Sequence, residues 1–311
     1  MRGGRGPSTV SSVSPLREIC IILLRELRKS FRSVKGILLL IFTMLAGGGL
    51  ALLLAQSDEV RKRQISERLQ DQHVSYEEAA LTVKRQLLSW WFADAGVGAH
   101  LAAAPFLLVV LFTVSLVMIP AVVLLLGFDS VSGELQHRAV RYWALRSRRW
   151  SYITGKFLGL WATCSIVALA MHLLIWIVIV ARGEAPLSET ISWGVRFWLA
   201  SLPIIAVWCS VSILFSGIFK HPILALLLTS GVFFVWWFIH VPAWVSTFSN
   251  SPPDGPVLPI PSKVLYSFPN FYDRFLLSPL LSQTLIGLAV TLGFAALCIA
   301  GSSAIFAKRD L

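Results

Sequence analysis

Gly155 and Lys156 form a Gly-Lys pair, the residue types with which a P-loop surrounds a bound phosphate group. A P-loop follows the pattern G-x-x-x-x-G-K-[ST], because its backbone N–H groups hold the phosphate oxygens and its last hydroxyl reaches the magnesium ion. Here Trp150 stands in place of the first glycine, and Phe157 stands in place of the hydroxyl residue. The sequence therefore predicts that this chain has no ATP site.

Other catalytic patterns are also missing from the sequence. The six histidines form no H-E-x-x-H zinc motif, and no G-x-S-x-G turn presents a nucleophilic serine. The four cysteines lie far apart and form no C-x-x-C pair. We therefore expect no catalytic residue, no metal site and no cofactor on this chain, which would not be an enzyme by itself.

The most informative stretch is residues 128–159, the loop that follows the second apolar stretch. Asp129 and Ser130 are of the types that cap the N-terminus of a helix, and they predict a short helix over residues 133–143. Three charged residues recur at spacings of four and three and would share one face of it: Glu134, Arg138 and Arg141. That face could bind a partner protein; the alternative is a solvated face that only helps to fix the membrane topology.

The sequence as a whole is strongly apolar. Of its 311 residues, 56% are hydrophobic and 14% charged, and the mean hydropathy is +0.73, which a water-soluble domain could not bury. A helix that crosses a bilayer needs about 20 apolar residues. Six stretches contain no Asp, Glu, Lys or Arg: 37–55, 101–128, 157–181, 197–219, 222–248 and 280–307. We therefore predict an all-α integral membrane protein with a six-span transmembrane domain over residues 37–307.

The net charge of +11 is explained by membrane topology, because Lys and Arg are spread between the apolar stretches and form no basic domain for nucleic acid. With both termini in the cytoplasm, 17 of the 27 Lys and Arg residues lie inside and 10 lie outside. This bias follows the positive-inside rule. We expect a multi-pass protein of the plasma (bacterial inner) membrane with cytoplasmic termini and no nucleic-acid partner.

The predicted spans contain no charged residue, whereas ion-coupled carriers usually place one inside a span. His172 and His240 are the strongly titratable candidates there, and such residues more often pack between helices. We therefore expect transport to be driven by another subunit. Three aromatic residues of the fifth span would either line a path for an amphipathic substrate or face lipid: Phe233, Trp236 and Trp237.

The segments outside the spans differ in character. Residues 1–14 are rich in Gly and Ser, which predicts a disordered cytoplasmic tail. Residues 15–33 predict an amphipathic helix that lies on the inner membrane surface and contacts lipid, either as a simple anchor or with a further role. Its surface residues of interest are Arg17, Arg25, Arg28 and Phe31.

Two longer loops lie on the outer side. Residues 56–100 predict an extracytoplasmic helical loop. Residues 249–279 hold many prolines and aromatic residues, so they cannot form one long helix. Their part 264–277 would dip back into the outer leaflet as a re-entrant segment shielded by protein.

The cytoplasmic loop 129–156 resembles that of ABC-2 type transporter permeases. Their pattern is roughly D-x-x-S/A-x-E, then an apolar turn, an Arg and a Gly-Lys pair that opens the third span. The matching residues are Asp129, Ser132, Glu134, Leu145, Arg149, Gly155 and Lys156. The order of segments and the terminal Arg309, Asp310 and Leu311 are also similar to the family, so the resemblance covers nearly the whole chain.

This resemblance implies that the short helix is a coupling helix, which binds in a cleft of a separate ABC ATPase subunit, and that helix 15–33 braces it. It also implies two copies of the chain and two ATPase chains, with ATP and magnesium bound on the ATPase. The residues expected to couple to the ATPase are Asp129, Gly133, Glu134, Arg138, Arg141, Tyr142, Arg149, Gly155 and Lys156.

The expected function is therefore that of the membrane subunit of an ABC exporter. A first alternative is an ABC-2-like subunit that transmits energy to an extracytoplasmic process, such as motility or metalloenzyme maturation, together with an extracytoplasmic accessory protein. A second alternative is a passive membrane scaffold or assembly factor. A Walker-type ATPase encoded next to this chain would favour the exporter or the first alternative over the scaffold.

Overall fold

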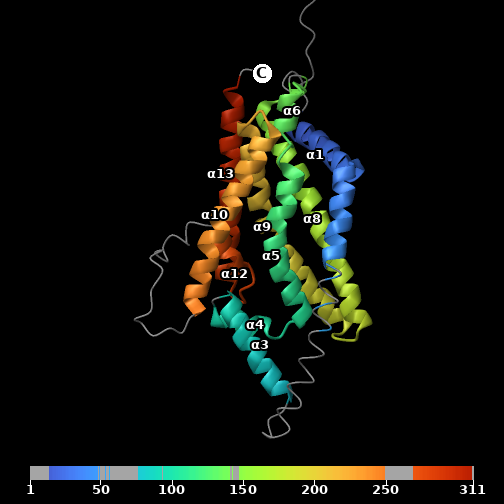
Figure 1. Ribbon diagram of the computed structural model, residues 1–311, viewed down its shortest axis with the longest axis vertical. Coiled ribbons are helices and arrows are strands. Elements are labelled where there is room, and N and C mark those ends of the chain that lie inside the picture. Colours follow the sequence, from blue (N-terminus) through green and yellow to red (C-terminus); the bar gives the residue numbers. More distant parts are fainter. Residues whose placement is uncertain are drawn as a thin grey trace, which may run out of the picture.

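The computed structural model describes residues 14–47, 49, 53, 56, 76–92, 94–140, 142, 147–248 and 269–309. These residues form helices joined by turns, and none of them lies in a strand (Figure 1). The expected all-α fold class is thereby confirmed.

Several of these helices suit a bilayer. Among the described residues, four helices are long and apolar enough to cross one: α5 (Phe106–Gly127), which a turn joins to α6 (Ser132–Gln136), α8 (Arg149–Ala181), α9 (Leu187–Ile218) and α13 (Leu281–Ala307). The helices α1 (Pro15–Arg32) and Val34–Gly47 meet at a bend of 69° and add a fifth span if they are taken together. α10 (Pro222–Phe248) is also apolar, at least over Pro222–Trp236. The chain is thus a multi-span membrane protein, while the count of six spans stays a prediction.

Two expected spans agree with the helices that form. α10 and α13 begin and end within one residue of the charge-free stretches 222–248 and 280–307. α1 matches the amphipathic helix expected over residues 15–33. The expected first span, 37–55, begins within the helix Val34–Gly47, and its later part lies largely outside the described residues. The tail 1–14 lies outside them too, except for Ser14.

Other boundaries differ from the expectation for physical reasons. α5 begins at Phe106 and not at residue 101, because Pro105 lacks the N–H that would continue a helix and disfavours helical backbone before it. α8 and α9 begin at Arg149 and Leu187, well before the expected starts at 157 and 197. Hydropathy marks only the part of a helix within the hydrocarbon, whereas backbone hydrogen bonding continues the helix into the polar zone.

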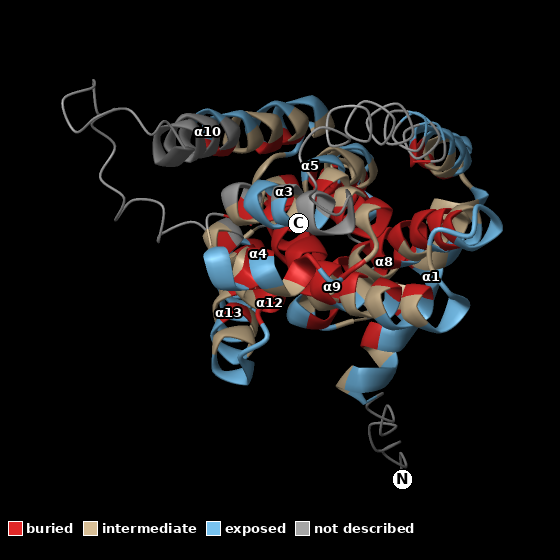
Figure 2. Cartoon of the chain, turned by 90° about the horizontal axis from the view of Figure 1, so that it is seen from below, coloured by how far each residue is buried: buried red, intermediate tan, exposed pale blue. Residues whose placement is uncertain are grey.

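α9 forms the centre of the bundle and packs against α5, α8, α10 and α13. Buried residues gather around it, and exposed residues lie on the outer faces (Figure 2). Outward-facing residues of α13, such as Leu285, Leu292 and Leu297, are apolar. In water such a surface would cause aggregation, whereas in a bilayer it faces lipid.

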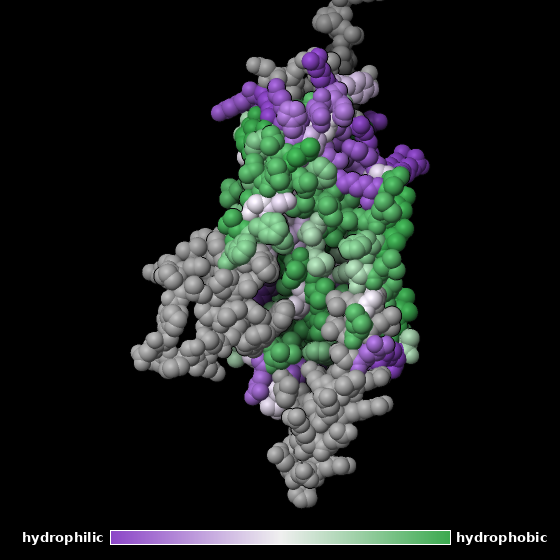
Figure 3. Space-filling model, viewed as in Figure 1, coloured by the Kyte–Doolittle hydropathy of each residue, from purple (hydrophilic) through white to green (hydrophobic). Residues whose placement is uncertain are grey.

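The bundle has two distinct ends. α1, α6, the first turns of α8 and the last turns of α13 lie at one end, which we call the α6 end (Figure 1). Hydrophilic side chains are concentrated there, and an apolar zone covers the middle of the molecule (Figure 3). The start of α1 and the end of α13 therefore lie on one side, as an even number of crossings requires.

Short helices cover the opposite end: α3 (Tyr76–Phe92), α4 (Ala95–Leu101), η1 (Pro269–Tyr272) and α12 (Asp273–Leu276). η1 and α12 pack against the first turns of α13, where Gly287 leaves room for Leu276. Leu277 is fully buried there. This is the later part of the expected re-entrant segment 264–277; residues 264–268 lie outside the described residues.

Candidate functional site

The expected coupling helix is much shorter than the sequence suggested. α6 spans only Ser132–Gln136, and the backbone leaves helical conformation at Arg138, whose φ is 57°. The prediction of a helix over residues 133–143 is therefore wrong, because its spacing argument required a helix to continue through a residue in the left-handed region. Glu134 and Arg138 do not share a helix face, and Arg141 lies outside the described residues.

The N-terminus of α6 is capped by a residue from another helix. Ser216 of α9 accepts hydrogen bonds at its Oγ from the backbone N–H groups of Val131 and Ser132, at 3.0 Å each. The same hydroxyl donates to the carbonyl oxygen of Phe128 at 3.0 Å. These contacts satisfy donors that every helix start leaves without an internal partner. α6 is thus attached directly to the central helix.

Asp129, the expected N-cap, has a different role. Its Oδ1 lies 2.8 Å from Nζ of Lys35, at the start of the helix Val34–Gly47. The same ammonium lies 4.2 Å from the centroid of the Phe128 ring. The prediction of an Asp129 cap is therefore wrong: this carboxylate joins the turn before α6 to the start of the helix that follows α1.

A buried ionic cluster lies behind α6, and we call Glu26, Glu134, Tyr152 and Lys156 the Lys156 cluster. The Lys156 Nζ lies 2.7 Å from Glu26 Oε1 and 2.6 Å from Glu134 Oε1. The Tyr152 hydroxyl donates to Glu134 Oε2 at 2.8 Å. Lys156 is 1% exposed, Glu26 6% and Glu134 7%. Glu134 therefore faces the interior, and the expectation that it contributes to a partner-facing surface is wrong.

Two glycines of α8 allow α1 to reach this cluster. A Cβ atom on Gly155 would lie 2.7 Å from Cβ of Ile22, and one on Gly159 would lie 2.5 Å from Cβ of Glu26. The G-x-x-x-G spacing thus permits a close helix contact. Because α1 lies directly on this surface, the Glu26 carboxylate reaches the ammonium of Lys156.

The contact between α1 and α8 continues toward the start of both helices. Glu18 of α1 accepts a hydrogen bond at Oε2 from the backbone N–H of Arg148, 3.1 Å away. Contacts with Arg148, Gly155 and Gly159 therefore follow the same order along both helices, which run in the same direction. Glu18 and the buried Glu26 were not singled out from the sequence, although Ile19, Ile22 and Glu26 occupy one helical stripe and are its buried members.

Two arginines close the carbonyl ends of the other helices at the α6 end. Arg149 donates from Nη1 to the carbonyl oxygens of Phe306, Ala307 and Arg309, at 3.3, 2.5 and 3.0 Å. Arg309 in turn donates to the carbonyls of Gly217, at 2.9 Å, and Ile218. The last carbonyls of α13 and α9 thus receive charged donors, which the helix dipole favours.

The surface of the α6 end remains open to a partner. Residues 136–139 and Tyr142 are exposed, and we call them the exposed tip. Gly133 is half-buried. The interfacial residues Arg17, Arg25 and Arg28 on α1 are exposed, whereas Phe31 is half-buried. Of the expected coupling residues, the structure thus places Arg138 and Tyr142 at the surface, and Glu134, Gly155 and Lys156 inside.

The expected aromatic path residues lie in a packed cluster. The rings of Phe233 and Trp236 on α10 have centroids 5.8 and 5.6 Å from that of Trp208 on α9. The side chain of Trp237 lies outside the described residues. This arrangement joins α10 to α9, and a role in lining a path stays a prediction.

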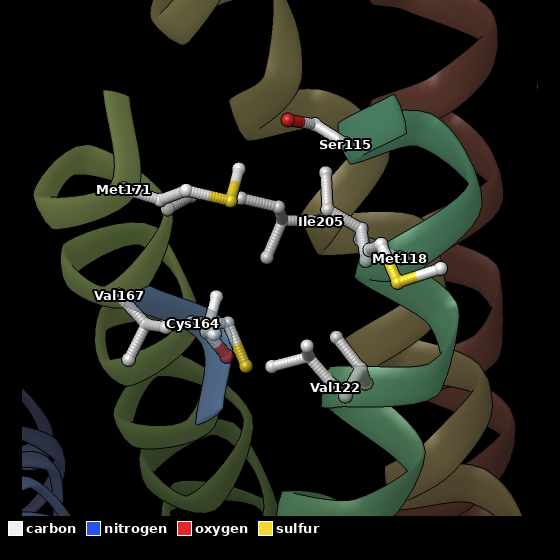
Figure 4. Close-up of a pocket in the computed structure, with 11 residues that line it drawn as sticks. Ser115, Met118, Val122, Cys164, Val167, Met171 and Ile205 are labelled. Atoms are coloured by element: carbon white, nitrogen blue, oxygen red, sulfur yellow. The ribbon is translucent and has the colours of Figure 1, made fainter. Parts of the chain in front are cut away.

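A small cavity lies elsewhere, between the helix Val34–Gly47, α5, α8 and α9. Figure 4 shows Met118 and Val122 on one side of it and Cys164, Val167 and Met171 on the other. Its two hydroxyl residues, Thr43 and Ser115, donate to backbone carbonyls of their own helices at 2.7 Å each. The cavity is therefore apolar. No group of three or more His, Cys, Asp or Glu residues that could hold a metal ion occurs in the described part of the chain.

His100 is a titratable residue on α4, at the end of the bundle opposite α6. Its ring centroid lies 5.2 Å from that of Trp193. Burial, together with the positive charge of Arg196, lowers the pKa of His100. The neutral imidazole is therefore favoured in the folded protein.

Residues 20–311 match the family described as ABC-2 family transporter protein. No curated protein matches the chain. The matched range begins within α1 and includes α6, the Lys156 cluster and all the expected spans.

Proposed function

Because the chain belongs to the ABC-2 transporter family, we propose that it is the permease subunit of an ATP-binding cassette exporter, driven by ATP hydrolysis on a separate ATPase subunit. Two copies of the chain would form the path across the membrane, and two ATPase chains would bind ATP and magnesium. The proposed docking site for each ATPase is the exposed tip.

One observation supports this proposal most strongly: a short helix with an exposed tip is fixed to several membrane helices at the polar end of the bundle. Ser216 attaches α6 to α9, and Glu134 attaches it to Lys156 of α8, which also binds Glu26 of α1. A force applied at residues 136–139 would therefore act on membrane helices and not only on a flexible loop. A passive scaffold would have no need of such an arrangement.

The mechanism follows from these attachments. Closure of the ATPases on ATP would displace the exposed tip, and α6 would move with it as a unit. The hydrogen bonds of Ser216 would pass the displacement to α9, which packs against α5, α8, α10 and α13. In this way a small displacement at one end would change the packing of the whole bundle, the usual form of such transitions.

The candidate ATPase would be a Walker-type ATPase encoded next to this chain. The proposal is tested by reconstituting the two proteins together in nanodiscs. Arg138→Glu and Tyr142→Ala, both on the exposed tip, should weaken ATPase binding and lower hydrolysis by the complex. Arg85→Glu on α3 is the matched control, because Arg85 is exposed at the opposite end. If the tip variants bind the ATPase as the native chain does, the docking site is wrong. If the native chain binds no ATPase, the proposed function itself is wrong.

Direction of transport is tested in sealed vesicles of inverted orientation. With the ATPase on the outer surface, ATP should drive cargo into the vesicle lumen. Stimulated hydrolysis without movement of any cargo would instead favour the transfer of energy to an extracytoplasmic process.

A further inference from the structure

We infer that Lys156 is a positioning residue: it joins α1 and α6 to the first turns of α8, so that displacement of α6 is passed to both helices. This inference rests on the proposed function, since the ATPase would provide the displacement. It concerns the interior of the α6 end, where Lys156, Glu26 and Glu134 are buried.

The first argument is geometric. One ammonium group lies between carboxylates of two other elements, Glu26 on α1 and Glu134 on α6, which are 130 and 22 positions away from it in the sequence. The Lys156 side chain has no exposed surface, and those of Glu26 and Glu134 are 8% exposed each. Solvent and salt therefore screen these attractions much less than they would at the surface.

The second argument is that α6 cannot maintain itself. A helix of five residues is too short to be stable alone, because forming the first turn costs more than its few hydrogen bonds return. Outside contacts must hold α6 in place. Two of them are polar: the cap by Ser216 at its start and the Glu134 carboxylate, which binds both Lys156 and Tyr152.

The third argument concerns charge. Two carboxylates are balanced by Lys156 and by Arg25, whose Nη1 lies 3.8 Å from Glu134 Oε1. A buried ionic cluster is often no more stabilising than well-packed apolar residues of similar volume. Unlike apolar packing, however, it requires one specific arrangement of its three helices. The cluster is therefore better suited to keeping α1, α6 and α8 in a fixed relative position when α6 is displaced than to raising the stability of the fold.

The geometry also explains the Gly-Lys pair that opens α8. Gly155 removes the side chain that would keep α1 away, and Lys156 then binds the acid that α1 brings. The pair has the letters of a phosphate-binding loop, yet its lysine is buried between two carboxylates. A phosphate group has no access to that ammonium.

The experiment compares three variants of the full chain in nanodiscs with the candidate ATPase. The first is the neutral triple variant Glu26→Gln, Glu134→Gln, Lys156→Met, which leaves no buried charge without a partner. The second is Lys156→Arg, which keeps the charge. The third is the control Lys220→Met, which removes an exposed lysine between α9 and α10.

The neutral triple variant should fold and bind the ATPase with nearly native affinity. The degree to which this variant stimulates ATP hydrolysis by the ATPase should be about tenfold lower than for the native chain, the size of a typical coupling between two sites. Lys156→Arg should restore part of the stimulation, and Lys220→Met should behave as the native chain does. Native stimulation in the triple variant would overturn the inference. Loss of ATPase binding would also overturn it, because the cluster would then merely shape the docking surface.

A second measurement needs no ATPase and separates this inference from the proposed function. Spin labels at Lys29→Cys on α1 and Gln136→Cys on α6, both exposed sites, report the distance between the two helices. Cys20 and Cys298 are replaced by Ser to avoid labelling them. The distance distribution should be narrow in the native cluster and broad in the neutral triple variant. Equal widths would show that Lys156 does not join the helices, whatever the native chain does with an ATPase.

Discussion

The Oγ atom of Ser216, near the end of α9, lies 3.0 Å from the backbone nitrogen of Ser132 at the start of α6. The two residues are 84 positions apart in the sequence, yet one side chain caps the other's helix. Through this contact the five-residue helix α6 depends on the central helix α9.

Ser216→Ala should lower stability by about 0.5–2 kcal/mol, the usual cost of losing an N-cap. The change leaves the backbone N–H groups of Val131 and Ser132 without their acceptor in a buried position. Thermal unfolding in detergent measures the effect. Ser192→Ala, at an exposed position on the same helix, serves as the control and should leave the midpoint unchanged. An unchanged midpoint in Ser216→Ala would contradict the cap.

Lys156→Met alone should be far more harmful than the neutral triple variant. The single change leaves the carboxylates of Glu26 and Glu134 buried without their shared ammonium, and breaking a buried ion pair in this way costs about 3–5 kcal/mol. The triple variant should recover most of that loss. Thermal unfolding of both variants shows which of them is less stable. If Lys156→Met is as stable as the neutral triple variant, the carboxylates do not need the lysine.

Gly159→Ala should destabilise the protein by about 1–3 kcal/mol, as overpacking generally does. The new Cβ would lie 2.5 Å from Cβ of Glu26, so α1 would have to move away from α8. Gly293→Ala on α13 is the matched control, because nothing lies within 4 Å of its Cβ position. There the higher helix propensity of Ala should stabilise by up to about 1 kcal/mol. Equal effects at the two sites would refute the close contact.

Stability should fall as the pH drops below the ordinary histidine pKa of 6.5, in part because of His100. Its pKa is lowered in the folded protein by burial and by Arg196, so below pH 6.5 the unfolded chain binds a proton more readily than the folded chain. The unfolding midpoint of the native chain is compared with that of His100→Gln between pH 7.5 and 5.5. The variant should lose less stability than the native chain as the pH falls. If the unfolding midpoints of the two proteins change equally with pH, His100 makes no contribution.

The spans could be predicted largely from composition. Transfer of each residue into hydrocarbon contributes nearly independently, so the bounds of α10 and α13 follow from the charge-free stretches alone. The start of α5 was also readable in principle, because Pro105 is a local signal that a count of charges ignores. Where the sequence was misread, as in the length of α6, the error came from assuming helical backbone through Arg138.

The site was predictable only in part. The sequence drew attention to Glu134, Gly155 and Lys156 as coupling residues, a role that stays a prediction, but it assigned Glu134 to a surface, whereas that residue is buried. Spacing along a chain gives the relative direction of neighbouring side chains and cannot say which direction is inward. A polar residue can lie inside a bundle only if its partner arrives there, and Glu26 reaches Lys156 from 130 positions away.

The sequence by itself thus determined that the chain lies in a membrane, that it carries no P-loop, and that its loop 129–156 resembles that of ABC-2 permeases. These properties depend on composition and on short patterns. Only the tertiary structure decided that Ser216 caps α6, that α1 packs on Gly155 and Gly159, and that Lys156 is held by two carboxylates. Each of these contacts joins residues from different helices, and their positions relative to one another are set by the packing of the bundle as a whole.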